Sequence, residues 1–418
     1  HTMSGTLNKE IKFHRLMNQR RVAYSLLQRL QTLLEPGSNF IRELNLLFKS
    51  QGKFGSRDRR LYRELIYTYL RYQTWLDPIR FDETAFLDAI IILANPTPEA
   101  STLYPTLSSP TANLQAPKDR HRLIGKSDND LIELIPSWFQ SHLSETLDSE
   151  SAKTLFSRPP LWLRIQRGDP KAIIEQLRQA SPNQANPPTA IWGVPDALLC
   201  PPGLPLSNVP AYQNGEIEIQ DISSQLLLQL VHPQPEGSWL DACAGAGGKT
   251  LQLAKMIGSN GCVTAYDPRS KALDELERRS RRARLKNISL LRSKPDRGSY
   301  DGVLVDAPCS GSGTWRRHPF LMRQTREKDI FQHSEAQSSI LHFYSERVAP
   351  GGILVYCTCS LSSYENKNVV KKFLETHSSF EPAPLAKNFD LEEIGNGITI
   401  SPAHLDGDGL YIATFRRS

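Results

Sequence analysis

Two cysteines are the side chains in this sequence best placed to do chemistry. Cys309 and Cys359 each lie at the end of an apolar, strand-like run, and each precedes a serine. A lone cysteine is usually a small buried side chain, but neighbouring parallel strands end at one edge of a sheet, where ligands bind. We therefore expect both thiols to be reactive and to meet at that edge, and we expect Cys357, Cys200 and Cys262 to be structural.

A thiolate beside a methyl donor suits the methylation of a pyrimidine carbon. C5 of cytosine is a poor nucleophile, and addition of a thiolate at C6 converts the ring into an enamine that can attack a methyl sulfonium. Asp306 lies three residues before Cys309, and its carboxyl group could stabilise the adduct at N3. A base must then remove the C5 proton so that the thiol can leave, and two cysteines could share these tasks.

A glycine-rich turn over residues 241–250 provides the candidate cofactor site. Such a turn lets backbone amides approach a ligand closely. Asp267 ends the next predicted strand, where an acid suits the hydroxyls of a ribose, and Asp241 would face the cationic end of the cofactor. The Walker and G-x-G-x-x-G spacings are absent, which favours S-adenosylmethionine over NAD; a tight turn without a ligand is the alternative.

The elements that must position these residues alternate between strand and helix. Helical runs at 249–257 and 270–285 separate strand-like runs, which span residues 238–243, 262–267, 288–292, 300–306 and 352–357. This alternation predicts a parallel, doubly wound α/β sheet in a domain of residues 219–418. A strand at 161–165 and a helix at 170–180 predict a small α/β linker subdomain over residues 136–218.

The N-terminal part is predicted to be helical and basic. Leucines at helical spacing predict helices over residues 7–94, and residues 95–128 read as a loop, within a domain of residues 3–135. Residues 1–80 carry fifteen basic and six acidic side chains, a net charge of +9 in a chain whose total is +6. A basic block on a near-neutral body favours a nucleic acid as partner; a solvated helical surface is the alternative.

Composition excludes several classes of protein. With 39% hydrophobic residues the chain can build real cores and is not disordered, and no apolar run approaches the ~20 residues of a membrane span. Six cysteines in 418 residues are too few for a disulfide scaffold. The N-terminus lacks the layout of a secretion signal, and we expect a cytoplasmic monomer with no membrane contact and no metal.

Several segments together resemble the RNA cytosine-C5 methyltransferases of the RsmB/Nop2/NSUN type. They span residues 220–225, 241–250, 306–313, 316–319, 358–360, 365–366 and 408–411. Residues 136–138 and 159–165 resemble the RsmB branch in particular, and the basic helical start resembles its NusB-like RNA-binding domain. The resemblance implies a Rossmann-like methyltransferase domain and a ribosomal RNA substrate, small-subunit (16S) RNA first and tRNA as the runner-up.

Residue roles carry over from the resemblance. It implies that Cys359 is the nucleophile and that Cys309 aids product release. Asp306 matches a cofactor-binding position and is also the residue expected to contact the cytosine ring. The remaining matches to cofactor-binding positions are Cys243, Ala244, Gly245, Ala246, Gly247, Gly248, Lys249 and Asp267.

The sequence departs from the family pattern at two places. Ala244–Gly248 has a glycine and an alanine where the family has alanine and proline. Where the family has an aspartate that contacts adenine, after the third strand, this chain has Ser293 and Lys294; Asp296, two residues later, is a weaker candidate for that contact.

Three rival functions remain to be weighed. A DNA cytosine methyltransferase also uses a Pro-Cys cysteine but lacks the second thiol. An exocyclic-amine methyltransferase would carry an Asn/Asp-Pro-Pro-Tyr/Phe motif where this chain has residues 306–309. A non-catalytic RNA-binding assembly factor would have a degenerate cofactor domain, and Lys294 is the main support for it.

Overall fold

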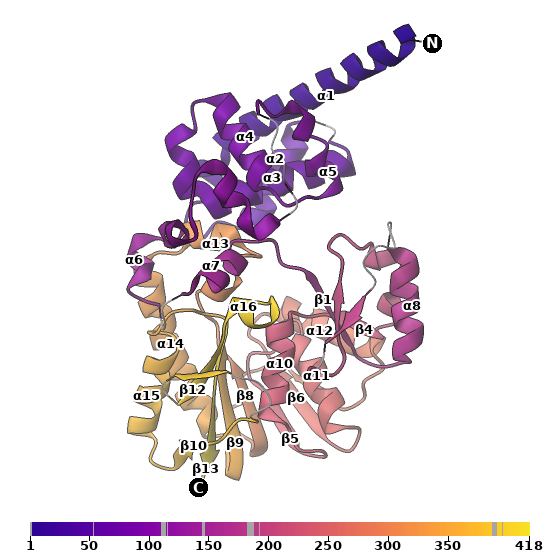
Figure 1. The fold of residues 1–418 in the computed structure, drawn as a ribbon. Helices are drawn as coiled ribbons and strands as arrows, with labels where there is room; N and C mark the ends of the chain where they lie inside the picture. Colours follow the sequence, from indigo (N-terminus) through magenta and orange to yellow (C-terminus); the bar gives the residue numbers. More distant parts are fainter. Residues whose placement is uncertain are drawn as a thin grey trace. The chain divides into compact units, whose positions relative to one another are not determined.

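The structure, a computed structural model, describes residues 2–52, 54–109, 114, 116–143, 147–181, 188–191, 193–386, 391–394 and 396–418. Contacts between residues divide the chain into two compact units. The first is built from residues 1–141, 147–158 and 314–326, and the second from residues 142–146, 159–313 and 327–418. The chain therefore leaves the first unit and returns to it (Figure 1).

The first unit is helical, as predicted for its N-terminal part. Its α-helices are α1 (Thr2–Gln28), α2 (Phe40–Ser50), α3 (Ser56–Leu76), α4 (Glu83–Leu93), α5 (Pro98–Ser101), α6 (Ser137–Gln140), α7 (Ser149–Leu155) and α13 (Pro319–Gln324). Its 3-10 helices are η1 (Leu30–Leu33), η2 (Asp77–Ile79), η3 (Tyr104–Thr106), η4 (Pro117–Ile124) and η5 (Asp128–Leu134).

Apolar side chains at helical spacing form the core of this unit. Leu26, Leu27 and Leu30 from the first helices are buried, as are Leu65 and Leu70 on α3. Side chains three or four residues apart lie on one face of a helix, so the predicted stripes become the packed faces. Residues 95–128, expected to be a loop, instead contain α5, η3 and η4; residues 110–113 and 115 lie outside the described part.

The segment of residues 314–326 completes the helical unit from the distant part of the sequence. Phe320 on α13 stacks on Phe40 of α2 with ring centroids 4.8 Å apart, and the Trp315 ring lies 4.9 Å from that of Phe139. Arg316 is fully buried and accepts a hydrogen bond at its carbonyl from the Arg71 guanidinium at 2.6 Å. The predicted domain boundaries did not include this return of the chain.

The second unit contains the predicted doubly wound sheet. Its strand order is β11-β12-β13-β9-β8-β5-β6-β7, with β10 paired to β13. The strands are β5 (Ser238–Asp241), β6 (Cys262–Tyr266), β7 (Ile288–Leu291), β8 (Tyr300–Asp306), β9 (Val348–Thr358), β10 (Phe380–Pro382), β11 (Glu392–Ile394), β12 (Gly397–Ile400) and β13 (Leu410–Arg417). Strands β5 to β9 pair in parallel, and β13 pairs antiparallel with β9.

The helices of the second unit connect and flank these strands (Figure 1). They are α10 (Ile222–Val231), α11 (Gly248–Ile257), α12 (Ser270–Arg282), α14 (Glu327–Ser345), α15 (Lys367–Thr376) and the short α16 (Pro402–Leu405). The parallel strands carry near-continuous apolar residues that are buried, such as Val303, Leu304 and Val305 of β8. Burial of both faces is what a parallel sheet covered by helices requires.

A small antiparallel sheet precedes the large one within the same unit. Its order is β2-β3-β1-β4, and it carries α8 (Pro170–Ala180), α9 (Pro210–Gln213) and the 3-10 helix η6 (Leu206–Asn208). Its strands are β1 (Leu161–Ile165), β2 (Thr189–Ala190), β3 (Ala197–Cys200) and β4 (Ile217–Ile219). The predicted strand and helix of the linker subdomain are thus present, but residues 147–158 of that expected subdomain pack with the helical unit.

Candidate active site

The structure brings the two candidate thiols into contact. Cys309 follows β8 and Cys359 follows β9, and the two strands pair in parallel with Asp306 opposite Cys357. Their common edge places the Sγ atoms of Cys309 and Cys359 3.2 Å apart. The contact with Cys359, burial, and the charges of Cys359 and Glu365 all raise the pKa of the Cys309 thiol. A thiol with a raised pKa is converted to the thiolate less readily than an ordinary cysteine.

The thiols are flanked by an ion pair between two of the predicted site residues. Lys249 Nζ donates to a carboxylate oxygen of Asp306 at 2.8 Å. Burial disfavours the charged lysine, but the charges of Asp306, Cys357 and Cys359 and the hydrogen bond to Asp306 together raise the pKa of Lys249. The ion pair lies beside Cys357, which is buried in the strand.

The glycine-rich turn between β5 and α11 leaves its backbone open. Gly245 and Gly247 have φ angles of 55° and 93°, which glycine adopts without steric cost. A Cβ on Gly248 would meet nothing within 4 Å, and one on Gly245 would meet only the end of the Arg269 side chain at 3.7 Å. Space is thus open beside Gly245 and Gly248, whereas a Cβ on Gly247 would lie 2.1 Å from Leu276.

Asp267 lies beside the turn, where its sequence position predicted it. Its carboxylate accepts hydrogen bonds from the Gly245 amide at 2.9 Å and from Arg269, whose backbone and Nε both donate at 2.9 Å. Burial opposes ionisation, but these hydrogen bonds dominate and lower the pKa of Asp267. The carboxylate is thus charged and is bound to the turn through Gly245.

Asp241 departs from its expected position. It is 1% exposed and accepts a hydrogen bond from Thr250 Oγ1 at 2.7 Å, which ties the end of β5 to α11. Burial raises the pKa of this carboxyl to about 7. One oxygen of this buried side chain is thus bound to the helix, and its other oxygen, Oδ1, has no hydrogen-bond partner among the residues that the structure describes.

Comparisons with known proteins show which family this chain belongs to. A family model described as 16S rRNA methyltransferase RsmB/F matches residues 228–416. The ribosomal RNA small subunit methyltransferase B of Yersinia enterocolitica is 30% identical over 298 residues, which are 69% of this chain and 67% of that protein. This chain belongs to the RsmB/F methyltransferase family.

Solved structures show that the fold is shared beyond the RsmB/F methyltransferases. The crystal structure of PH0851 aligns with a TM-score of 0.71 at 20% identity and covers 96% of this chain and 98% of that one. NSun6 from Pyrococcus horikoshii, crystallised with SFG, aligns with a TM-score of 0.59 at 18% identity and covers 68% of this chain and 98% of that one.

The cofactor of this RsmB/F-family methyltransferase is S-adenosylmethionine. The turn fits it, because space is open beside Gly245 and Gly248 and the charged carboxylate of Asp267 lies next to them. Among the described residues, no cluster of acidic, histidine or cysteine side chains could hold a metal ion. No helix in the described part of the chain is long and apolar enough to cross a membrane.

After β7, where an acid was expected from the family pattern, this chain has Lys294 in a loop held by an aromatic ring. Lys294 Nζ lies 3.7 Å from the centroid of the Phe343 ring, and the Arg347 guanidinium lies 3.9 Å from the same centroid. Arg347 also donates to the carbonyl of Asp296 at 2.8 Å. Cation–π contacts therefore fix this loop, a role for Phe343 and Arg347 that the sequence analysis missed.

Sequence reasoning also missed the polar residues that surround the thiols. Glu365 and Gln337 are both fully buried and both make hydrogen bonds to the loop that carries Cys309. The Glu365-Asn366 pair was noticed only as part of the family motif, and Gln337 lies in a helical run without any distinguishing neighbour. The signal available for Glu365 was an acid six residues after the second cysteine.

Proposed function

We propose that the protein transfers a methyl group from S-adenosylmethionine to C5 of a cytosine in small-subunit ribosomal RNA. The observation that carries this proposal is the 3.2 Å contact between Cys309 and Cys359 beside the Asp306–Lys249 pair. A methyltransferase acting on an oxygen or an exocyclic amine has no use for two adjacent thiols. The 16S rRNA description of the family model supports the choice of RNA.

The proposed reaction assigns one task to each thiol. The Cys359 thiolate adds to C6, the S–C6 bond forms, and the electrons of the C5=C6 bond move onto C5 as it takes the methyl group. S-Adenosylmethionine would supply that methyl group as an electrophilic sulfonium, whose S–CH3 bond breaks as the C5–CH3 bond forms so that S-adenosylhomocysteine leaves. A proton shared between Asp306 and N3 of the ring forms a hydrogen bond that stabilises the adduct.

Release of the product reverses the addition. A base removes the C5 proton, the C5–H electrons re-form the C5=C6 bond, and the S–C6 bond breaks to return the Cys359 thiolate. Cys309 aids this step, and its sulfur lies at contact distance from the leaving one.

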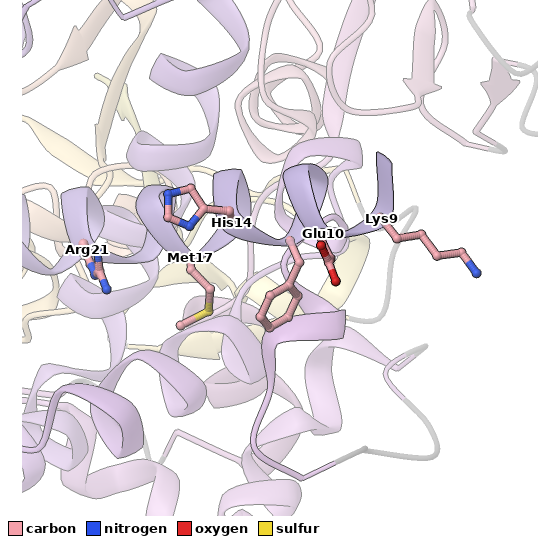
Figure 2. A pocket seen from close by; sticks show the side chains of 6 residues that line it. Lys9, Glu10, His14, Met17 and Arg21 are labelled. Carbon is pink, nitrogen blue, oxygen red and sulfur yellow. The ribbon is translucent and has the colours of Figure 1, made fainter. Parts of the chain in front are cut away.

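The helical unit is proposed to hold the RNA. Its helix α1 has an exposed stretch over residues 8–15, and a hollow on this helix is lined by Lys9, Glu10, Phe13, His14, Met17 and Arg21 (Figure 2). Cations on an exposed helix neutralise phosphates without reading sequence. We propose that this surface docks the RNA backbone.

Bisulfite sequencing of RNA tests the proposed reaction directly. Total RNA from cells with and without the protein is treated, and one protected cytosine in small-subunit ribosomal RNA is expected only where the protein is present. A protected cytosine in tRNA would assign the runner-up substrate. No protected cytosine, together with tight RNA binding, would favour a non-catalytic assembly factor.

A further inference from the structure

A single buried carboxylate, that of Glu365, joins the two loops that carry the thiols. Its Oε1 atom accepts a hydrogen bond from the backbone amide of Ser310 at 2.8 Å. Its Oε2 atom accepts from the hydroxyl of Ser310 at 2.6 Å and from the hydroxyl of Ser360. Ser310 follows Cys309 and Ser360 follows Cys359, so each thiol is one residue away from a group bound to the same carboxylate.

Gln337 on α14 secures the other side of the Cys309 loop. Its Nε2 atom donates to the carbonyl of Pro308 at 2.9 Å and to Glu365 Oε1 at 3.1 Å. Cys309 thus lies between two residues, Pro308 and Ser310, whose backbones are both held by this pair. The position of its sulfur is determined by the network rather than by the loop alone.

Further hydrogen bonds fix Glu365 relative to the Cys359 loop. The Tyr356 hydroxyl donates to the carbonyl of Glu365 at 2.5 Å. Asn366 donates to the carbonyl of Ser360 at 2.8 Å and accepts from the hydroxyl of Thr358 at 2.5 Å. The carboxylate is therefore anchored to β9 and to the residues on either side of Cys359.

Stability alone does not account for a charge at this place. Glu365 is 0% exposed, and no cationic side chain among the described residues forms an ion pair with it. A buried carboxylate costs several kcal/mol of desolvation, and replacement by a well-packed apolar residue is often no less stable. The carboxylate accepts four hydrogen bonds. Three come from Ser310 and Ser360 on the two loops that carry the thiols, and one comes from Gln337 on α14.

We propose that Glu365 is a positioning residue for the two thiols, which it holds in contact by binding Ser310 and Ser360 at once. The inference rests on the proposed function, in which both sulfurs act on one base, because a misplacement of about 1 Å costs on the order of a hundredfold in rate. Glu365 touches neither sulfur in a hydrogen bond and acts through the serines beside them.

Oxidative cross-linking of the two cysteines measures this positioning without RNA or cofactor. Diamide takes two electrons and two protons from the thiols of Cys309 and Cys359, which form one disulfide while diamide becomes the hydrazine. Peptide mapping by mass spectrometry separates this link from links to other cysteines. We expect Glu365→Ala to slow its formation by about tenfold or more.

The isosteric change Glu365→Gln is the decisive partner experiment. A glutamine keeps one acceptor oxygen for the Ser310 amide, and the two serine hydroxyls can rotate to accept from its amide group. Cross-linking in Glu365→Gln is therefore expected to stay within about threefold of the natural chain. A loss as large as in Glu365→Ala would overturn the proposal, as would an alanine variant that cross-links at the natural rate.

Glu218→Ala is the matched control, because Glu218 is equally buried but binds Arg279 and Arg282 instead of the thiol loops. It is expected to lower thermal stability and leave the cross-linking rate unchanged.

If Glu365→Ala does not fold, Ser360→Ala is the second variant, because it removes the hydrogen bond between the Ser360 hydroxyl and Glu365. An unchanged cross-linking rate in Ser360→Ala would also overturn the proposal. Absence of 5-methylcytosine would refute the proposed function while leaving the cross-linking result standing.

Discussion

The backbones of Gly313 and Gly409 lie against each other with no room for a side chain. The Gly409 amide donates to the Gly313 carbonyl at 2.9 Å, and a Cβ on Gly313 would lie 2.0 Å from the carbonyl oxygen of Gly409. The Gly313 amide in turn donates to the carbonyl of Cys359 at 2.8 Å. The end of the Cys309 loop is thereby fixed to β13 and to the second thiol.

Gly313→Ala should therefore displace the Cys309 loop, although Gly313 itself is not a catalytic residue. The new methyl group meets backbone atoms, which cannot rotate away, so the loop must shift; we expect about a hundredfold loss of methyl transfer and ~1–3 kcal/mol of stability. Gly55→Ala is the control, because its Cβ would meet nothing closer than 4.0 Å. An active Gly313→Ala enzyme would show that the loop tolerates displacement.

The two thiols should give opposite results when removed. Cys359→Ala is expected to abolish methyl transfer and to leave cofactor affinity intact, because no other group in the motif can add to C6. In Cys309→Ala, Cys359 should still add to the cytosine and C5 should still take the methyl group. The covalent protein–RNA adduct should then fail to break down. Denaturing electrophoresis with labelled RNA detects the stalled species as a slow band that RNase removes.

A slow band from Cys359→Ala and none from Cys309→Ala would reverse the assignment and indicate the arrangement of a DNA-type enzyme. A non-catalytic binding protein would give no band from either variant.

Cofactor affinity should depend on Asp267. In Asp267→Ala the ribose hydroxyls lose a charged acceptor, and the Gly245 amide loses its partner, so we expect S-adenosylmethionine to bind about tenfold more weakly or worse. Titration calorimetry measures this. Asp274→Ala, an exposed acid that pairs with Arg292, should change nothing, and equal affinities for both variants would remove Asp267 from the cofactor site.

RNA binding should depend on the cations of α1. Charge reversal at Lys9, Lys12 and Arg15 should weaken RNA binding and flatten its salt dependence, because each lost phosphate contact lowers the slope of log K against log salt by roughly 0.7 to 0.9. Cofactor affinity should not change. Deleting residues 3–94 is the poorer test, because it would also strip Phe320 and Arg316 of their partners.

Charge reversal at Arg278, Arg281 and Lys286 on or next to α12 is the matched control. Arg278 and Arg281 form ion pairs with Glu275 and Glu277 on their own helix, as expected for a solvated face. RNA affinity that falls equally in both triple variants would mean that net charge, and not the α1 surface, governs binding.

The helical unit should lose stability in mild acid through His318. Burial, and then the charge of Arg317, lowers the pKa of His318 from 6.5 to about 4. As the pH falls, His318 is therefore protonated in the unfolded chain before it is protonated in the folded one. The contribution of the neutral, buried His318 to the free energy of unfolding is complete above pH 6.5. It is lost as the pH falls toward 4, by up to ~3 kcal/mol. Urea unfolding at pH 7 and pH 5 should show a smaller loss in His318→Phe; the same loss in both chains would contradict the prediction.

The parts predicted from sequence are those that depend on neighbours along the chain. Strand β8 begins and ends at the predicted residues, and the meeting of Cys309 and Cys359 followed from parallel topology alone. Periodicity says nothing about pairs far apart in sequence. Arg316 was noticed only as part of a family motif, and its complete burial and its bond to Ser157 were not predicted.

Glu365 was missed as a functional residue for a related reason. An acid in a polar stretch after a strand is usually solvated, and only the tertiary structure shows that its four hydrogen-bond donors come from three separate segments. The cation–π loop after β7 was missed likewise, because Lys294 was judged by the acid it replaced and not by the Phe343 ring that it contacts.

The return of residues 314–326 to the helical unit has a consequence for the order of biosynthesis. A ribosome completes α1 to α7 long before it makes Trp315 and Phe320, which those helices need for their core. Domains generally fold as units during translation, N-terminal first. The core of the helical unit, however, stays incomplete until the strands through β8 and then residues 314–326 have been synthesised. Nascent chains arrested before and after residue 326 should therefore differ in the protease resistance of their N-terminal helices, and a chaperone that shields apolar surface has its opportunity in that interval.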